Sequence, residues 1–324
     1  MTGYLALLQP APPVAPTSIA GRFRIAGTSP DGDSVRFTAD EPGVWRDAGI
    51  RARVNAAGST QLRLDAIDAL ETHYAPPGGS GQWRQPPEFA VRATESLLTR
   101  LGFDGWRRDP DTGTISNPEP AEVPGWIVTA GADLNGRPVS FVLAGDRAAA
   151  GARWSAGGGD GPVALTPDML GATVNAGQLA DGLAYPTFYT DLAADLRDAL
   201  AAITATARTA GTGIWAADVT TSGFVLTGRT QLETEVVLLP KLFRRLAEYL
   251  SLDGPETGSS AGVSLAGFHD FLAVSADAVR VLPDGPLTTL ADLVRVEGQR
   301  VALAVEPERL VFSEKETRVR PLTD

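Results

Sequence analysis

Residues 22–38 read RFRIAGTSPDGDSVRFT, and this stretch decides how the first part of the chain is interpreted. At residues 22–26 and 34–38, apolar and polar side chains alternate, which is typical of half-buried β-strands. Between the two runs, Ser29-Pro30-Asp31-Gly32-Asp33 is a turn signal. The stretch therefore predicts two neighbouring strands joined by an acidic turn.

The elements that follow predict an α+β fold. Further strands are expected at 61–67 and, as a hairpin around Asn135-Gly136, at 126–130 and 138–143. Helical periodicity predicts helices at 87–101, 167–183 and 190–208. A small antiparallel β-barrel with packed helices satisfies this order of elements.

The pattern of predicted elements changes after Trp215. A strand is predicted at 222–227, an amphipathic helix at 238–250, a flexible Gly/Ser loop at 253–262 and short β-like runs at 263–314. We expect the helix to pack on its own domain rather than on a membrane or a partner. The predicted division is an N-terminal extension (1–20), a first domain (21–215) and a smaller accessory α+β domain of unknown role (216–324).

Composition excludes several classes of protein. The 324 residues contain no cysteine, so thiolate catalysis, disulfides and cysteine zinc sites are excluded, and His73 and His269 alone cannot form a multi-histidine metal site. The formal net charge of -11 argues against binding nucleic acid by bulk attraction, so any affinity must come from a local site. Neither a membrane-spanning run nor a signal peptide is recognisable, and a cytoplasmic location is expected.

Two groups of charged side chains are candidates for chemistry. Asp31 and Asp33 flank a glycine in the acidic turn, where carboxylates are commonly solvated but also suit a hard cation. Arg63, Asp68 and Glu71 follow on the third predicted strand and at its end. They form either a structural ion pair or part of a site that binds an anion.

Six motifs in the same order resemble the staphylococcal nuclease (thermonuclease) family over residues 21–215. They are Asp31-Gly32-Asp33-Ser34, Arg63…Asp68-Ala69-Leu70-Glu71, Pro87-Glu88-Phe89-Ala90, Gly136-Arg137, Val174-Asn175…Gly182-Leu183-Ala184, and Leu196-Arg197 with Ile214-Trp215. The resemblance implies a five-stranded OB-fold barrel with packed helices. It also implies a metal-dependent phosphodiesterase that hydrolyses DNA or RNA by water attack on the phosphate.

The resemblance further implies a role for each matching residue. Ca²⁺, with Mg²⁺ or Mn²⁺ as alternatives, is expected on Asp33, Asp68 and the Ala69 carbonyl, with Asp31 orienting a metal-bound water. The catalytic residues would be Arg63 and Arg137, which donate to the phosphate, and Glu71, which activates the water. Substrate-binding aromatic rings are expected among Tyr185, Phe188 and Tyr189.

The sequence departs from the family pattern at several positions, and two other functions stay open. Ala69-Leu70 replaces a threonine–proline pair, Leu134-Asn135 replaces a lysine–tyrosine pair, and several loops around the predicted barrel are longer. One alternative is a non-catalytic OB-fold module that binds nucleic acid or protein. The other is a phosphodiesterase for a small substrate. Every charged position of the catalytic set is filled, which favours an enzyme, and the oligomeric state is not predicted.

Overall fold

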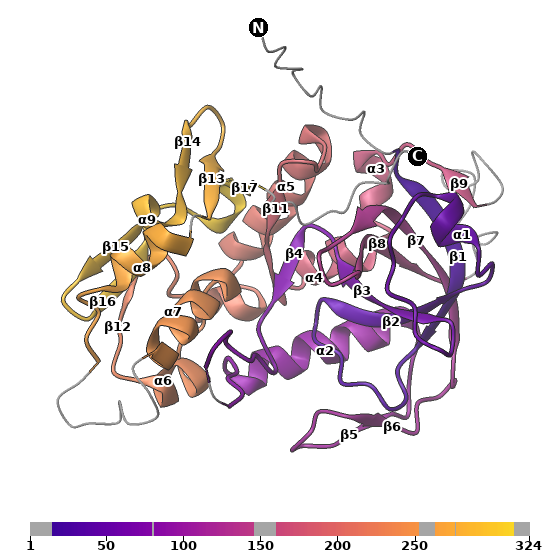
Figure 1. The fold of residues 1–324 in the computed structure, drawn as a ribbon, viewed down its shortest axis with the longest axis horizontal. Helices are drawn as coiled ribbons and strands as arrows, with labels where there is room; N and C mark the ends of the chain where they lie inside the picture. Colours follow the sequence, from indigo (N-terminus) through magenta and orange to yellow (C-terminus); the bar gives the residue numbers. More distant parts are fainter. Residues whose placement is uncertain (1–14, 80, 146–159, 253–262, 276, 314–324) are drawn as a thin grey trace, which may run out of the picture.

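A computed structural model describes residues 15–79, 81–145, 160–252, 263–275 and 277–313. A β-barrel and a C-terminal region of short helices and strands lie side by side (Figure 1). Most of the predicted N-terminal extension, most of the Ala/Gly-rich run 146–162 and the whole predicted loop 253–262 fall outside the described residues. Within the described ranges, no helix combines the length and the apolar character needed to cross a membrane.

Five strands close the barrel. They are β1 (Thr17–Arg24), β2 (Ser34–Ala39), β3 (Ser59–Leu64), β7 (Val123–Ala132) and β8 (Pro138–Ala144). Their order is β2-β3-β8-β7-β1, and a further pairing of β1 with β2 closes the ring. The short strand β9 (Gly161–Pro162) pairs with the start of β1. The predicted α+β class is confirmed, and the closed five-stranded barrel is like an OB-fold.

One pairing differs from the predicted antiparallel barrel. Strands β3 and β8 run parallel, with Arg63 opposite Val139, whereas the other barrel pairings are antiparallel. Parallel strands need a long connection. Here the chain leaves β3 and returns to β8 by way of α2 (Pro87–Leu101) and β7. The prediction of an all-antiparallel barrel was therefore wrong.

The predicted strand 61–67 is two strands with a corner between them. β3 ends at Leu64 and β4 (Ile67–Ala69) begins three residues later, because Ala66 has a φ of 65°. The Asp65 carboxylate stabilises the corner by accepting a hydrogen bond of 2.8 Å from the amide of Ala66. The corner carries the chain from the barrel into a second small sheet, in which β4 pairs with β10 (Ala184–Pro186).

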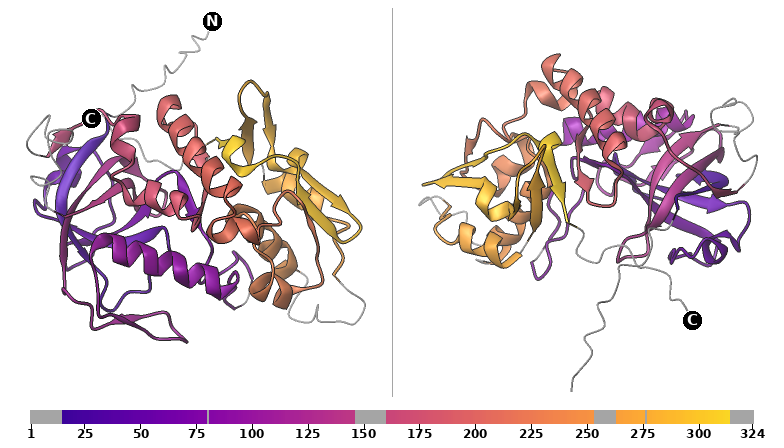
Figure 2. Two further views of the ribbon diagram at one scale, coloured as in Figure 1. Left: turned by 180° about the vertical axis from the view of Figure 1, so that it is seen from behind. Right: turned by 90° about the horizontal axis from the view of Figure 1, so that it is seen from above.

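Helices cover the side of the barrel that faces the C-terminal region (Figure 2). The predicted helix 87–101 matches α2, and the helix predicted at 190–208 is α5 (Ala194–Thr209). The helix predicted at 167–183 is instead α3 (Pro167–Leu170) and α4 (Val174–Ala180). Thr173 breaks it, because its hydroxyl caps α4 by accepting from the amide of Ala176. Short elements complete this part: α1 (Val44–Asp47), β5 (Arg107–Arg108), β6 (Ile115–Ser116), β11 (Phe188–Tyr189) and the 3-10 turn η1 (Gly213–Ala216).

The C-terminal region contains more helix than the sequence predicts. Its elements are β12 (Phe224–Val225), α6 (Arg229–Thr234), α7 (Pro240–Leu252), α8 (Phe268–Ser275), β13 (Ala278–Val281), β14 (Leu287–Thr289), α9 (Leu290–Leu293), β15 (Val294–Glu297), β16 (Arg300–Leu303), η2 (Pro307–Arg309) and β17 (Leu310–Phe312). The amphipathic helix predicted at 238–250 is α7, and it packs on its own chain as expected. Part of the segment 263–314, where short β-like runs are predicted, is the helix α8, because a short apolar run does not distinguish strand from helix.

Segments that lie outside the barrel strands pack into the core and into one sheet of the C-terminal region. β11 pairs in parallel with β17, so the last described strand extends a segment that follows the barrel helices. Leu70, Tyr185 and Trp215 pack in the same hydrophobic cluster as α7. An ion pair of 2.5 Å between Arg208 on α5 and Glu308 in η2 adds a further tie. The C-terminal region is therefore fixed against the side of the barrel where β4 and β10 lie.

The buried Asn175 side chain holds α4 against the barrel. Its amide nitrogen donates to the carbonyls of Asp65 (2.8 Å) and Ser140 (3.0 Å), and its amide oxygen accepts from the amide of Val142 (2.9 Å). All three partners are backbone groups that would lose their bond together if the side chain were shortened.

We expect Asn175→Ala to lower the free energy of unfolding by about 3 kcal/mol, because each buried polar group left unsatisfied costs about 1–3 kcal/mol. Urea denaturation measures the loss. Asn135→Ala, in the exposed hairpin turn, is the control and should change stability by less than about 0.5 kcal/mol. A loss below about 1 kcal/mol for Asn175→Ala would contradict the bridging role.

Candidate functional site

Four predicted acidic residues meet at one edge of the barrel. Asp31 and Asp33 lie in the turn before β2, Asp68 lies in β4, and Glu71 follows β4 by two residues. The amide of Ala69 donates to the Asp33 carboxylate at 3.3 Å, which joins the turn to β4. The amide of Leu64 donates to the carbonyl of Asp33 at 2.8 Å, which joins the turn to the end of β3. Segments that are far apart in sequence thus present their carboxylates at the same place.

The glycine between the two aspartates is required by close packing. A Cβ at Gly32 would lie 2.5 Å from the Cβ of Ala93 on α2 and 2.9 Å from that of Ala69. The buried Gln178 of α4 donates to the carbonyls of Gly32 (2.7 Å) and Ala93 (2.8 Å). The acidic turn is therefore held between β4 and two helices, and the positions of its carboxylates are fixed by the fold.

Arg244 on α7 enters this acidic group from the C-terminal region. Its Nη1 and Nη2 donate to the two oxygens of Asp68 at 3.1 and 2.6 Å, and Nη1 also donates to Glu71 Oε1 at 2.5 Å. Such two-pronged pairing is the strongest hydrogen-bonded geometry of a guanidinium with carboxylates. Burial opposes the charged form of Asp68, but the guanidinium of Arg244 outweighs it and holds the pKa of Asp68 below its usual value. Glu71 differs, because burial raises its pKa despite the same arginine.

Asp33 has no such counter-ion. Burial, together with the nearby carboxylates of Asp68, Asp31 and Glu71, raises the pKa of Asp33 from 3.8 to about 8. Asp31 is differently placed: its carboxylate accepts a hydrogen bond from the hydroxyl of Thr72 and lies 3.5 Å from His73 Nδ1. The site thus holds Asp33 protonated at neutral pH beside an Asp68 that is charged.

Positive side chains and a phenol lie next to the acids. The guanidinium carbon of Arg63 is 5.8 Å from the centroid of the Tyr189 ring, and Lys241 Nζ of α7 is 5.9 Å from the same centroid. Burial opposes ionisation of Tyr189, but Lys241 and Arg63 together lower its pKa. Lys241 also contacts Asp277 Oδ1 at 3.7 Å. Within the described ranges, no hydrogen bond or ion pair joins Arg63 to a carboxylate.

Three predicted site residues are engaged elsewhere. Arg137 lies two residues before Val139, the partner of Arg63 across the sheet, but its guanidinium is bound to Asp133 of its own turn, with Nε and Nη2 both 2.7 Å from Oδ2. Tyr185 is buried, donates to Asp218 at 2.7 Å and packs edge-on against Trp215. Phe188 is buried in the core. Of the three aromatic candidates, Tyr189 is the one whose ring lies beside Arg63 and Lys241.

The predicted calcium ligands do not fit a divalent cation in this arrangement. Of the predicted ligands, Asp68 has both of its carboxylate oxygens hydrogen-bonded to Arg244, and the Asp33 carboxylate accepts from the amide of Ala69. Among the residues that the structure describes, no three acidic or histidine side chains are arranged to hold a metal ion. The acids do cluster, but a guanidinium neutralises two of them.

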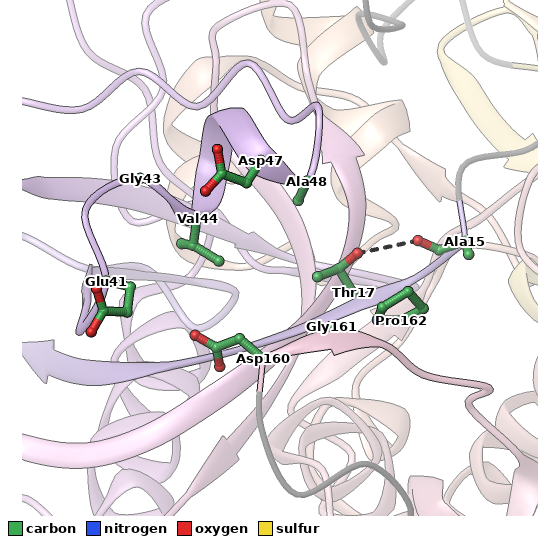
Figure 3. Close-up of a pocket in the computed structure, with 10 residues that line it drawn as sticks. All are labelled: Ala15, Thr17, Glu41, Gly43, Val44, Asp47, Ala48, Asp160, Gly161 and Pro162. Atoms are coloured by element: carbon green, nitrogen blue, oxygen red, sulfur yellow. Dashed lines mark hydrogen bonds between the residues drawn. The ribbon is translucent and has the colours of Figure 1, made fainter.

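A cavity of about 570 Å³ lies elsewhere, where α1 borders the start of β1 (Figure 3). Glu41, Asp47 and Asp160 line it beside Val44 and Pro162. Asp160 is already used structurally, since it accepts a hydrogen bond of 2.8 Å from the amide of Ala20. None of the predicted site residues borders this cavity.

Sequence reasoning missed Arg244 and Lys241. Both lie in the helix that the sequence does predict, but Arg244 is 176 positions from Asp68. The available signal was the pair Arg244-Arg245 within an amphipathic helix that also carries Lys241. No protein-family model matches the chain, and a search of curated proteins finds no match. The resemblance to staphylococcal nucleases therefore rests on the sequence motifs.

The raised pKa of Asp33 makes stability depend on pH. Between about pH 4 and pH 8 the folded chain keeps a proton on Asp33 that the unfolded chain releases, so the contribution of this group to stability falls as pH rises across that window. Asparagine cannot titrate there. We therefore expect the free energy of unfolding of Asp33→Asn, relative to that of the native chain, to increase by more than about 1 kcal/mol from pH 5 to pH 8. One pKa unit is worth about 1.4 kcal/mol.

Urea denaturation at several pH values measures this difference. Asp284→Asn, at an exposed aspartate, controls for the loss of one carboxylate. A difference between the native chain and Asp33→Asn that does not change with pH would contradict the assignment.

Proposed function

We propose that the chain hydrolyses phosphodiester bonds of nucleic acid at the site formed by Asp33, Glu71 and Arg63. The observation that supports this most strongly is Arg63 itself. Its half-buried guanidinium borders an acidic group, yet within the described residues it has neither a hydrogen bond nor an ion pair with a carboxylate. A planar two-pronged donor in that position suits the non-bridging oxygens of a phosphate.

The chemistry needs positive charge at the phosphate and a base for the water, because a phosphodiester is an anion and repels hydroxide. In the proposed mechanism Arg63 donates to the non-bridging oxygens, where negative charge grows as phosphorus becomes five-coordinate. Lys241 adds positive potential, with its Nζ 5.9 Å from the centroid of the Tyr189 ring. The Tyr189 ring is half-buried at the same place and is the proposed contact for a base or sugar.

Glu71 and Asp33 are the proposed base and acid. Glu71 accepts a proton from water as the water oxygen bonds to phosphorus. Its raised pKa brings its basicity closer to neutral pH, where general bases work best. Asp33, with a pKa of about 8, donates its proton to the leaving oxygen as the bond from that oxygen to phosphorus breaks. Solvent then returns the proton from Glu71 to Asp33, and no step passes through a metal ion.

One observation favours the non-catalytic alternative. The contact of 2.5 Å from Arg244 to Glu71 reduces the basicity of this carboxylate. A barrel that only binds a phosphate chain would keep Arg63 and Lys241 and would have no need of a base. Cleavage, rather than binding, is therefore the decisive measurement.

The test is a cleavage assay on end-labelled single-stranded DNA and RNA, with calcium and with excess EDTA in parallel. We expect cleavage by the native chain and a rate at least about 10²-fold lower for Glu71→Gln, the scale of losing general base catalysis. Glu88→Gln, at an exposed position in the first turn of α2, is the matched control and should cleave normally. Binding of both polymers without cleavage in either buffer would support the binding module instead.

Arg63→Ala should lower kcat/KM by about 10²-fold, because it removes a preorganised donor that acts on the transition state. Arg22→Ala provides the control. Arg22 is an exposed barrel arginine on β1 whose contacts to Asp40 (3.8 Å) and Glu122 (3.9 Å) are at the surface. Steady-state kinetics on a short oligonucleotide measures both variants. A loss below about tenfold for Arg63→Ala would remove Arg63 from the phosphate-binding role.

A further inference from the structure

Arg244 is presented by a helix that is firmly anchored. Leu242, Phe243 and Leu246 of α7 are fully buried in the hydrophobic cluster that also contains Leu70, Tyr185 and Trp215. The next residue, Arg245, is bound to Asp277 through Nε at 2.6 Å and Nη2 at 3.0 Å. Because both the apolar face and the neighbouring arginine are fixed, the Arg244 guanidinium is part of the built site rather than a side chain resting on its surface.

The guanidinium occupies the oxygens that a cation would use. The side chains of Asp68 and Glu71 are only 3% and 14% exposed, and three of their four carboxylate oxygens receive hydrogen bonds from Arg244. A hard divalent cation binds such carboxylates through the same oxygens. Arg244 and a cation therefore cannot both hold Asp68 and Glu71 in this arrangement.

Removing the guanidinium would leave two desolvated carboxylates facing each other, with Asp33 close by. An uncompensated buried charge is strongly destabilising, so these acids need some positive partner. Arg63 does not contact them directly, and Lys241 is held near Tyr189 and Asp277. Arg244 is thus the group that supplies the positive charge that Asp68 and Glu71 need.

We propose that Arg244 takes the place of a divalent cation at Asp68 and Glu71, so that the site works without added metal and binds a cation only when this guanidinium is removed. The part that concerns catalysis rests on the proposed hydrolase function. The part that concerns cation binding does not.

Titration calorimetry with CaCl₂ tests cation binding independently of any activity. We expect no measurable binding to the native chain and clear binding to Arg244→Gln, tighter by at least about tenfold, the effect of freeing metal-orienting carboxylates. Arg295→Gln is the control, since it removes an exposed guanidinium on β15 of the same C-terminal region and should behave as the native chain. Calcium binding to the native chain as tight as to Arg244→Gln would overturn the proposal, and so would a folded Arg244→Gln that binds none.

A second variant covers the case in which Arg244→Gln does not fold. Arg244→Lys keeps one positive charge but has no planar fork to bridge both carboxylates. It should fold, as judged by near-ultraviolet circular dichroism, and bind calcium more tightly than the native chain. Binding no tighter than that of the native chain would overturn the proposal in the same way.

Cleavage in excess EDTA tests the catalytic part. The native chain should cleave equally fast with EDTA and with calcium, whereas Arg244→Gln should lose about 10²-fold in EDTA and recover part of it with calcium. Native cleavage that EDTA abolishes would refute the metal-free site. If no variant cleaves in either buffer while calorimetry gives the expected order, the hydrolase proposal fails and the counter-ion role stands.

Discussion

Negative charge gathers at one edge of the barrel, and the rest of the site depends on how that charge is compensated. Asp31, Asp33, Asp68 and Glu71 come from a turn, a short strand and the segment after it, so only the folded chain brings them together. Taking carboxylates out of water is costly unless each finds a partner. Arg244 provides that partner for two of them through three hydrogen bonds.

This unequal compensation separates the acids chemically. Asp68, held by the fork of Arg244, keeps a lowered pKa, whereas Asp33 lies among carboxylates and has its pKa raised to about 8. Environments that push the pKa values of neighbouring groups apart let one site hold a protonated and a charged carboxyl group at the same pH. Half-buried Arg63 near Tyr189 adds a donor that no carboxylate satisfies within the described ranges.

Local signals in the sequence predicted much of the barrel. The alternating run at 22–26 corresponds only to the last three residues of β1, whereas 34–38 matches most of β2 and the periodic segment 87–101 is α2, because pattern and propensity agree there. The corner at Ala66 was missed, since an alanine with positive φ carries no local signal. The helix α8 was also missed, since its apolar run is too short for its period to be read.

Only those residues of the site that belong to local sequence motifs could be predicted. The acidic turn and the strand-end acids could be placed together from their order along the chain, whereas Arg244 could not, because no local pattern links it to Asp68. The side chain of Arg137 was also out of reach of sequence reasoning. Its pairing with Asp133 depends on the conformation of one hairpin turn. Pairings between side chains that are far apart in sequence depend on the tertiary fold, which local patterns do not encode.

The separation of 176 positions between Asp68 and Arg244 bears on how the protein is made. A chain is synthesised from its N-terminus, and its early parts begin to fold before its later parts emerge. The barrel strands are all complete before α7 has been translated, so the nascent barrel must carry its crowded carboxylates in contact with water until the helix arrives. Docking of α7, and then of β17 against β11, is consequently the event that excludes water from these carboxylates. A ribosome-bound chain stalled before residue 244 would have the barrel strands and the acids but not Arg244.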